Sequence, residues 1–368
     1  MCKETRAAPT PSRKNVETFA RAVKSPFRKR LSMRILVTGS AGFIGFHLAR
    51  RLLEAGHDVV GVDGFTPYYD RTLKLKRHEI LAQSQSFTGC EAMLEDLPAL
   101  QDIYGEGYDA VYHFAAQAGV RYSLENPRAY VDANLVGTFN LLELMRHKPP
   151  AHALMASTSS VYGANASVPF REIDRADHPL TFYAASKKAN EEMAHAYGHL
   201  FGIPITMLRF FTVYGPWGRP DMALFKFAAA LFEGRPLDIY NRGDMRRDFT
   251  YIDDLVEAMI LLLEKVPPAP SRRQSAPSEI DSLSPTAPWR VVNIGAQTPI
   301  ALMDFVAAIE AATGLRAACN FMDMQEGDVP LTHADTRLLI QLTGFTPRTT
   351  LQDGVNAFIA WYRAYFGL

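Results

Sequence analysis

The chain has 368 residues, of which 48% are hydrophobic and 21% are charged, and its 39 basic side chains balance 39 acidic ones. This length and composition are typical of a globular protein with two domains of about 100–200 residues each. The zero net charge excludes nucleic-acid binding through wholesale counterion release. No stretch contains the roughly 18 consecutive apolar residues that a membrane helix needs, so we expect neither nucleic acid nor a membrane as a partner.

Two segments differ in composition from the rest of the chain. Residues 1–32 contain nine Lys or Arg, two acids and three prolines, which predicts a disordered basic extension. Residues 267–288 contain six prolines and five serines, which predicts a surface loop. The three cysteines, Cys2, Cys90 and Cys319, are too scattered for a disulfide framework or a thiolate metal site. They favour a reducing, cytoplasmic setting and no metal.

Strand and helix patterns alternate from residue 34 onward. In chain order we predict strands at 34–38, 58–63, 109–114, 151–157 and 205–210 and helices at 43–54, 129–144 and 183–200. Beyond Gly215 the pattern predicts strands at 237–240 and 291–294 and helices at 222–233, 252–264, 302–313 and 351–365. Because the early strands are apolar throughout, both faces of their sheet must be covered. This indicates an α/β fold with a parallel, doubly wound (Rossmann) sheet.

The predicted elements divide into two domains. We expect the doubly wound sheet to occupy residues 33–205, completed by segments near 250–264 and 291–295. Residues 206–368 are expected to form mainly a smaller C-terminal α/β domain that binds the substrate. Ligands of doubly wound sheets bind at the carboxyl ends of the strands.

Three glycines follow the first predicted strand. Gly39, Gly42 and Gly45 open the first helix, where missing side chains permit a tight turn and close approach of the backbone to a pyrophosphate. Their spacing departs from the GxGxxG fingerprint, and such glycines also occur in ordinary packed turns. Asp63 strengthens the pattern because it closes the second strand, 18 residues after Gly45. A carboxylate there accepts both hydroxyls of an adenosine ribose and repels a 2′-phosphate, which predicts NAD as the cofactor.

Tyr183 and Lys187 are spaced i,i+4 at the start of a predicted helix, so both lie on one helix face. An ammonium beside a phenol favours the phenolate, as does a nearby positively charged nicotinamide. Together they would lower the pKa of Tyr183 enough for it to act as a general base. This spacing also arises by chance, so its place in the chain matters. Thr158, Ser159 and Ser160 follow the fourth long strand, which puts hydroxyls at the carboxyl edge of the same sheet.

These residues lie in segments that resemble a known family. From Met33 onward the chain is similar to the extended short-chain dehydrogenase/reductases, and more closely to the NAD-dependent nucleotide-sugar epimerases of the UDP-glucuronate 4-epimerase type. The segments that carry the resemblance are TGSAGFIG (38–45), FAAQAGVRYSLENP (114–127), TSSVYG (158–163), YAASK (183–187), LRFFTVYGPWGRPDMALFKF (208–227) and RRDFTYIDD (246–254). The resemblance implies that Tyr183 takes the proton of a sugar 4-hydroxyl while hydride passes from C4 to NAD. The 4-keto intermediate then turns over, and hydride returns to its other face.

The resemblance also implies roles for individual positions. Thr158 would bind the sugar beside the base, Arg219 and Arg247 the diphosphate, Asp328 a ribose, and the Asp96–Leu97 pair the adenine. The positions implied in cofactor binding are Gly39, Gly42, Phe43, Ile44, Gly45, Asp63, Asp96, Leu97, Ala115, Ala116, Asn134, Tyr183 and Lys187. The positions implied in substrate binding are Arg121, Ser159, Ser160, Thr212, Arg219, Arg247 and Asp328.

Smaller features favour UDP-glucuronate as the substrate. UDP-galactose 4-epimerases commonly carry Asn where Thr212 stands, and a threonine leaves more room near C6 for a carboxylate. Together with Thr158, Ser159 and Ser160, it would offer neutral donors to the carboxylate and restrain a β-keto acid that can lose CO₂. The two serines also replace the acidic residues of related 4,6-dehydratases and decarboxylases, which disfavours both reactions. UDP-glucose 4-epimerisation is the alternative, and a non-catalytic NAD-binding scaffold is a distant one.

Other features carry simpler interpretations. His195 and His199 share a helix face at i,i+4, but no third metal ligand is evident, so we interpret them as ordinary helix residues. The basic run 28–30 is interpreted as part of a solvated tail. From the resemblance alone, a homodimer is expected through the helices that carry Leu142–Leu144 and Met193–Tyr197.

Overall fold

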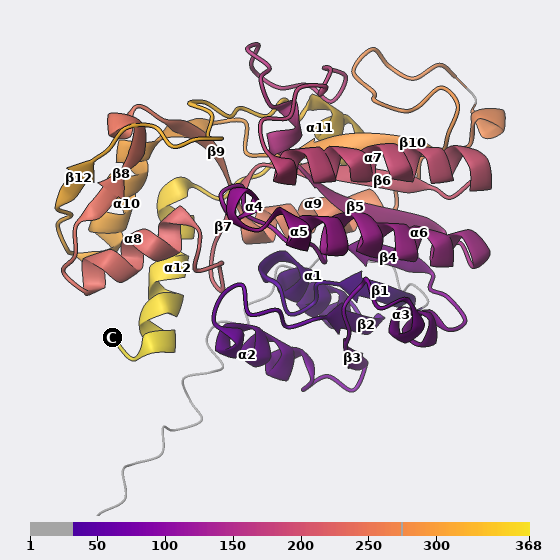
Figure 1. Cartoon of the computed structure of the whole chain (residues 1–368), viewed down its shortest axis with the longest axis horizontal. Coiled ribbons are helices and arrows are strands. Elements are labelled where there is room, and N and C mark those ends of the chain that lie inside the picture. Colours follow the sequence, from indigo (N-terminus) through magenta and orange to yellow (C-terminus); the bar gives the residue numbers. More distant parts are fainter. Residues whose placement is uncertain (1–31, 274) are drawn as a thin grey trace, which may run out of the picture. The chain divides into compact units, whose positions relative to one another are not determined.

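A seven-stranded parallel sheet organises the N-terminal part of the chain (Figure 1). The computed structural model describes residues 32–273 and 275–368, so residues 1–31 of the predicted extension, with Cys2 and the basic run 28–30, lie outside the described residues. From edge to edge the sheet contains β3 (Phe87–Glu91), β2 (Asp58–Asp63), β1 (Arg34–Thr38), β4 (Ala110–His113), β5 (His152–Thr158), β6 (Ile205–Phe210) and β10 (Trp289–Ile294). Every adjacent pair is parallel. This strand order is that of a doubly wound sheet and confirms the predicted fold class.

Helices cover both faces of this sheet. On one face the buried core is built from α1 (Phe43–Glu54), α9 (Ile252–Leu263) and α11 (Arg337–Thr343). On the other face it is built from α3 (Leu97–Tyr104), α6 (Gly137–His147) and α7 (Phe182–Phe201). α2 (Arg71–Leu81) connects β2 to β3. Strands β1 and β5 are buried along nearly their whole length, which explains their continuous apolar pattern.

The remaining elements form a smaller α/β region with its own core. Its elements are the sheet β11 (Pro299–Ala301), β9 (Arg246–Tyr251) and β7 (Thr212–Tyr214), the pair β12 (Cys319–Phe321) and β8 (Leu237–Ile239), and the helices α8 (Ala223–Phe232), α10 (Leu302–Thr313) and α12 (Leu351–Phe366). Phe249 of β9 stacks on Phe305 of α10, with ring centroids 4.2 Å apart. Aromatic packing of this kind joins the short strands to the helices.

The helix predicted over 129–144 is interrupted. The short α4 (Tyr122–Glu125) and α5 (Pro127–Tyr130) are followed by a π-helical turn, η3 (Val131–Val136), before α6 begins. This turn carries Asn134, which accepts a hydrogen bond from the Gln117 N–H (2.8 Å) and donates one to the Gln117 carbonyl (3.1 Å). Hydrophobic periodicity does not reveal a single wide turn, and such turns often accompany functional sites.

The Pro- and Ser-rich segment 267–288 links α9 to β10 and lies against α7. His195 Nε2 is 2.7 Å from Ser284 Oγ, and His199 Nδ1 is 2.9 Å from the Thr286 carbonyl. The two histidines therefore hold this segment on the helix. Within the described residues, no helix is both long and apolar enough to cross a membrane.

Candidate active site

A large cavity lies at the carboxyl ends of the sheet strands and extends beneath the smaller α/β region. Its volume is about 1320 Å³, which exceeds the roughly 300–1,000 Å³ typical of sites for one small molecule. Loops that follow β1, β2, β4 and β5 form one side, and residues between Thr212 and Tyr240 form the other. The cavity therefore has room for a dinucleotide and a second ligand beside it.

The glycine loop after β1 fits a pyrophosphate. Gly39 has a φ of 75°, and a Cβ at this position would lie 2.8 Å from the Ala115 nitrogen. A Cβ on Gly45 would lie 2.1 Å from the Gly39 carbonyl oxygen. Both positions therefore require glycine. Within the part of the chain that the structure describes, no side chain caps the N-terminus of α1, so its first N–H groups can bind an anion.

Asp63 ends β2 at the edge of the same loop. Its carboxylate accepts hydrogen bonds from the Ala41 N–H (3.1 Å) and from the Phe65 N–H (2.8 Å), one on each oxygen. Each carboxylate oxygen retains a further lone pair, which suits two ribose hydroxyls. The donors and acceptors around the loop thus fit an adenosine dinucleotide.

The tyrosine and lysine predicted from the sequence face the cavity from the first two turns of α7. The helix begins where it does because Thr181 Oγ1 accepts a hydrogen bond from the Ala184 N–H (3.2 Å). Lys187 is only 3% exposed, and no hydrogen bond within the described residues uses its ammonium. A buried donor without an acceptor, facing the cavity, fits the hydroxyls of a bound ribose.

Burial is the main cause of the pKa shifts of Lys187 and Tyr183. It lowers the pKa of Lys187 to about 8, although Glu191, one turn further along α7, favours the charged form. Burial also raises the pKa of Tyr183 above its ordinary value, against the opposing effects of a hydrogen bond from Thr158 and the charge of Arg219. Among the protein's own groups, the phenol thus loses more by desolvation than its neighbours return, and the predicted fall in the pKa of Tyr183 depends on the charge of the cofactor.

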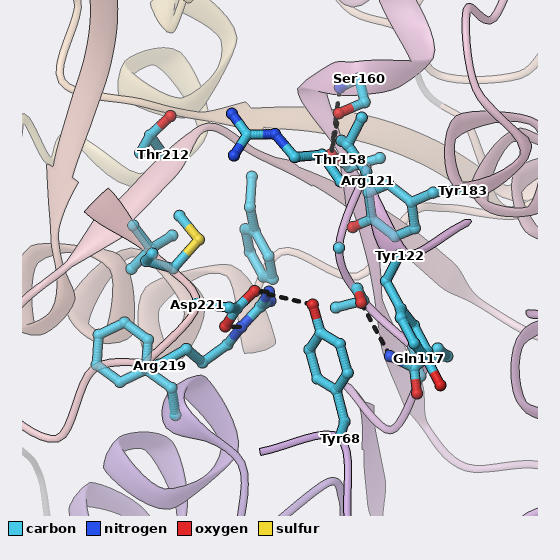
Figure 2. Close-up of a pocket in the computed structure, with 18 of the residues that line it drawn as sticks. Tyr68, Gln117, Arg121, Tyr122, Thr158, Ser160, Tyr183, Thr212, Arg219 and Asp221 are labelled. Carbon is cyan, nitrogen blue, oxygen red and sulfur yellow. Dashed lines mark hydrogen bonds and ion pairs between the residues drawn. The ribbon is translucent and has the colours of Figure 1, made fainter. Parts of the chain in front are cut away.

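Hydroxyl groups gather beside the tyrosine, where β5 ends and the 3₁₀ turn η4 (Ser159–Tyr162) begins. Thr158 Oγ1 accepts a hydrogen bond from the Ser160 N–H (3.2 Å) and donates to Ser160 Oγ (3.2 Å). Figure 2 shows Thr158 and Ser160 near Tyr183, with Thr212 across the cavity. These residues and Ser159 all line the cavity. They present neutral donors to the cavity from two sides, three from η4 and the end of β5 and one from Thr212.

Two cavity residues without a role predicted from the sequence, Asp221 and Tyr68, form a chain of contacts from Arg219. Arg219 Nε donates to Asp221 Oδ1 (3.0 Å), and the Tyr68 hydroxyl donates to Asp221 Oδ2 (3.1 Å), as Figure 2 shows. Burial opposes ionisation of Asp221, but the charge of Arg219 and the hydrogen bonds from Arg219 and Tyr68 together outweigh it and lower the pKa of the carboxyl. Asp221 stands two residues from Arg219, which is a usable sequence signal. Tyr68 lies in an irregular loop, where no pattern marks it.

A further group of charged residues lines the cavity at Arg121, Arg247 and Asp328. Arg121 pairs with Asp328 (3.3 Å), and its guanidinium lies 5.0 Å from the centre of the Tyr240 ring. Burial lowers the pKa of the neighbouring Arg247, and Asp328 counteracts this effect. The cavity thus contains arginines at two places, near Asp221 and near Asp328, which could hold a ligand with two or more phosphates.

Three predicted cofactor residues do not line the cavity. Asp96 caps α3 by accepting a hydrogen bond from the Ala99 N–H (3.2 Å), and Leu97 begins that helix. The cavity wall beside them is residues 92–95. Asn134 is fully buried and also donates to Ser186 Oγ (2.9 Å), so its effect on a ligand would be indirect. The remaining predicted site residues all line the cavity.

A doubly wound sheet with a glycine loop and a Tyr–Lys pair at its carboxyl edge defines a class of dinucleotide-binding enzymes. The sequence model of the NAD dependent epimerase/dehydratase family matches residues 35–273. The chain belongs to this family, which confirms the resemblance found in the sequence.

Individual relatives narrow the comparison. The chain is 57% identical over 331 residues to the "Probable UDP-glucuronate 4-epimerase" of Rhizobium meliloti (strain 1021), covering 90% of this chain and 97% of the relative. It is 43% identical over 342 residues to UDP-glucuronate 4-epimerase 1 of Arabidopsis thaliana, covering 90% and 77%. The crystal structure of UDP-glucuronic acid 4-epimerase from Bacillus cereus, in complex with UDP-glucuronic acid and NAD, is similar with a TM-score of 0.79 and 33% identity. That match covers 90% of this chain and 100% of the other.

Proposed function

We propose that this protein is an NAD-dependent 4-epimerase that interconverts UDP-glucuronate and UDP-galacturonate through a 4-keto intermediate. The observation that carries the proposal is the meeting, in one cavity, of a glycine loop, the Tyr183–Lys187 pair and a cluster of neutral hydroxyls. The relatives named for this reaction, and the similar structure crystallised with UDP-glucuronic acid and NAD, support it.

The glycine loop and α7 would hold the cofactor. The loop would take the pyrophosphate, Asp63 the adenosine ribose, and the Lys187 ammonium the second ribose. When bound, NAD supplies the reversible oxidation of the sugar at C4 and a positive charge beside the phenol. That charge favours ionisation of Tyr183, whose own surroundings raise its pKa.

The proton moves through Tyr183. The phenol oxygen takes the proton of the sugar 4-hydroxyl and returns it after the ring has turned, while Thr158 orients the hydroxyl. Turning requires that affinity reside in the nucleotide part rather than in the sugar. Arg219 and Arg247 would supply it by binding the diphosphate, so remote binding energy keeps the intermediate in place.

The hydroxyl cluster is expected to recognise the sugar carboxylate. Thr212→Val keeps the shape of the side chain and removes its donor. We expect kcat/KM for UDP-glucuronate to fall roughly 10-fold or more, because a hydrogen bond to a charged group contributes about 1.5–3 kcal/mol. The same constant for UDP-glucose, which has no carboxylate, should change far less. Equal losses on both substrates, measured in parallel, would contradict the assignment.

The reaction itself is tested with purified protein, UDP-glucuronate and no added reductant. We expect UDP-galacturonate to accumulate, identified by its stereochemistry at C4 in NMR spectra. UDP-glucose and UDP-N-acetylglucosamine in the same panel measure substrate preference. Bound NAD without conversion of any of these sugars would refute the proposed epimerase activity and favour a non-catalytic NAD-binding scaffold. Preferred turnover of UDP-glucose would identify UDP-glucose as the substrate in place of UDP-glucuronate.

We further propose a cytoplasmic homodimer that pairs through α6 and α7, which pack against each other (Figure 1). Leu142 is fully buried in the core and is not available to a partner, but Phe139 of α6 and Leu200 of α7 are 47% and 67% exposed. The free cysteines Cys90 and Cys319 suit a reducing compartment. Light scattering should give twice the chain mass, and Phe139→Asp should give a monomer. A monomeric wild type would contradict the dimer.

A further inference from the structure

A buried arginine behind the cavity joins the glycine loop to the segment that carries Arg219. Arg77, on α2, is fully buried, and no carboxylate in the described part of the chain forms an ion pair with it. Its guanidinium donates instead to four neutral oxygens: the carbonyls of Ala41 (2.9 Å), Trp217 (2.5 Å) and Gly218 (3.4 Å) and the Tyr69 hydroxyl (2.9 Å). Burying a charge without an ion-pair partner costs stability. The contribution of Arg77 is therefore to fix the positions of these carbonyls rather than to stabilise the fold.

One end of this contact is the glycine loop. Ala41 lies between Gly39 and Gly42, and its N–H donates to Asp63 while its carbonyl accepts from Arg77. The two peptide groups on either side of Ala41 are therefore held from different directions, by β2 and by α2. The loop that would receive the cofactor pyrophosphate is tied to Arg77.

The other end is the backbone directly before Arg219. Trp217 has a φ of 60°, which is uncommon for a bulky side chain and needs surrounding contacts to persist. The preceding carbonyl, of Pro216, is 2.9 Å from His47 Nε2, and burial lowers the pKa of His47 to about 3, so a neutral imidazole donates there. Side chains of α1 and α2 thus bind three consecutive carbonyls, at positions 216–218.

We propose that Arg77 is a positioning residue that fixes the 216–218 backbone relative to the glycine loop, so that Arg219 reaches the diphosphate of a UDP-sugar lying beside the cofactor. The proposal rests on the proposed function for the identity of the ligand. It predicts that Arg77, which does not line the cavity, affects nucleotide affinity only through Arg219.

A double-mutant cycle tests this dependence. The dissociation constant of UDP is measured by calorimetry on the NAD-loaded wild type, Arg77→Lys, Arg219→Met and the double variant. Lysine keeps the charge but cannot donate to carbonyls on both sides. We expect each single substitution to weaken UDP binding about 10-fold, and the double variant to bind no more weakly than Arg219→Met. If Arg77 only stabilised the fold, the losses of UDP affinity in the two single variants would add in the double variant.

Additive losses, or unchanged UDP affinity in Arg77→Lys or in Arg219→Met, would overturn the inference. Arg77→Gln is the second variant if lysine is not tolerated. If neither retains NAD at wild-type stoichiometry, Arg77 serves the glycine loop alone and the inference is also overturned. Arg71→Met, an exposed arginine on the same helix, is the matched control and should leave UDP affinity unchanged. Because the cycle measures only binding, failure of the epimerase assay would refute the proposed function separately.

Discussion

Replacing Tyr183 with Phe is expected to lower kcat for UDP-glucuronate epimerisation about 10³-fold while NAD remains bound. The substitution removes only the phenol oxygen, and general acid–base groups typically contribute 10²–10⁴-fold. The ring keeps its packing against Tyr130, whose centroid is 6.0 Å away, so the fold of α7 should be preserved. Turnover is measured from the C4 stereochemistry of the product, and bound NAD from the supernatant of denatured protein.

Tyr197→Phe is the matched control for this experiment. Tyr197 lies on the same helix, but its hydroxyl donates to Glu143 rather than facing the cavity. We expect this variant to keep wild-type kcat. Activity within a few-fold of wild type in Tyr183→Phe would show that another group transfers the proton, and loss of NAD from that variant would show that its defect lies in cofactor binding.

Lys187→Met is expected to abolish most activity and yet stabilise the protein stripped of NAD. The side chain is 3% exposed, no hydrogen bond among residues 32–273 and 275–368 uses its ammonium, and its pKa is lowered from 10.5 to about 8. That depression corresponds to a stability cost of about 3 kcal/mol at neutral pH, which an apolar side chain of similar length removes. We expect a higher midpoint in urea unfolding, together with a loss of kcat of at least about 100-fold.

The stabilisation has a defined pH dependence. Below about pH 8 the lysine is charged in both the folded and the unfolded chain, so the wild type bears the full cost. Between about pH 8 and 10.5 the folded protein releases the proton first, the unfolded chain binds more protons, and wild-type stability rises relative to the variant. The difference between the two proteins should therefore shrink as the pH rises through this window. A difference that stays constant with pH would contradict a charged Lys187 at neutral pH.

Lys188→Met is the control variant, and its expected effect on stability is opposite to that of Lys187→Met. Lys188 is adjacent in sequence, forms ion pairs with Glu191 (3.3 Å) and Glu192 (2.8 Å), and does not line the cavity. Removing it leaves the buried Glu191 with fewer partners, so stability should fall and activity should persist. A gain in stability in both lysine variants would point to a general effect of methionine on α7.

Sequence patterns were sufficient to predict a strand or helix where enough of its residues share one environment, buried or exposed, to form a repeat. Strands β1, β2 and β5 are continuous apolar runs because helices cover both of their faces. The edge strand β3 was missed because most of its residues are exposed and show no apolar run. Helix α2 was missed because it buries Lys74 and Arg77, so charged residues stand on its inner face.

The same local rules located much of the candidate site. Gly39 and Gly45 are required by backbone approaches of under 3 Å to neighbouring atoms, and such requirements appear directly as glycines. The i,i+4 spacing of Tyr183 and Lys187 places them on one helix face whatever the rest of the fold does. Asp96, predicted to contact the adenine, caps α3 and does not line the cavity. A helix cap has the same sequence signature as a loop that holds a ligand, so the sequence alone does not separate the two roles.

By itself, then, the sequence determined the doubly wound sheet, the glycine loop and the Tyr–Lys pair, because each depends on residues close together along the chain. Only the tertiary structure decided that Tyr68 reaches Asp221 across 153 positions and that Arg77 reaches Trp217 across 140. It also set the burial of Tyr183, which raises the pKa of the phenol against the effect of the neighbouring Arg219 charge. Contacts and desolvation depend on distances in space, and the spacing of residues along the chain does not determine those distances.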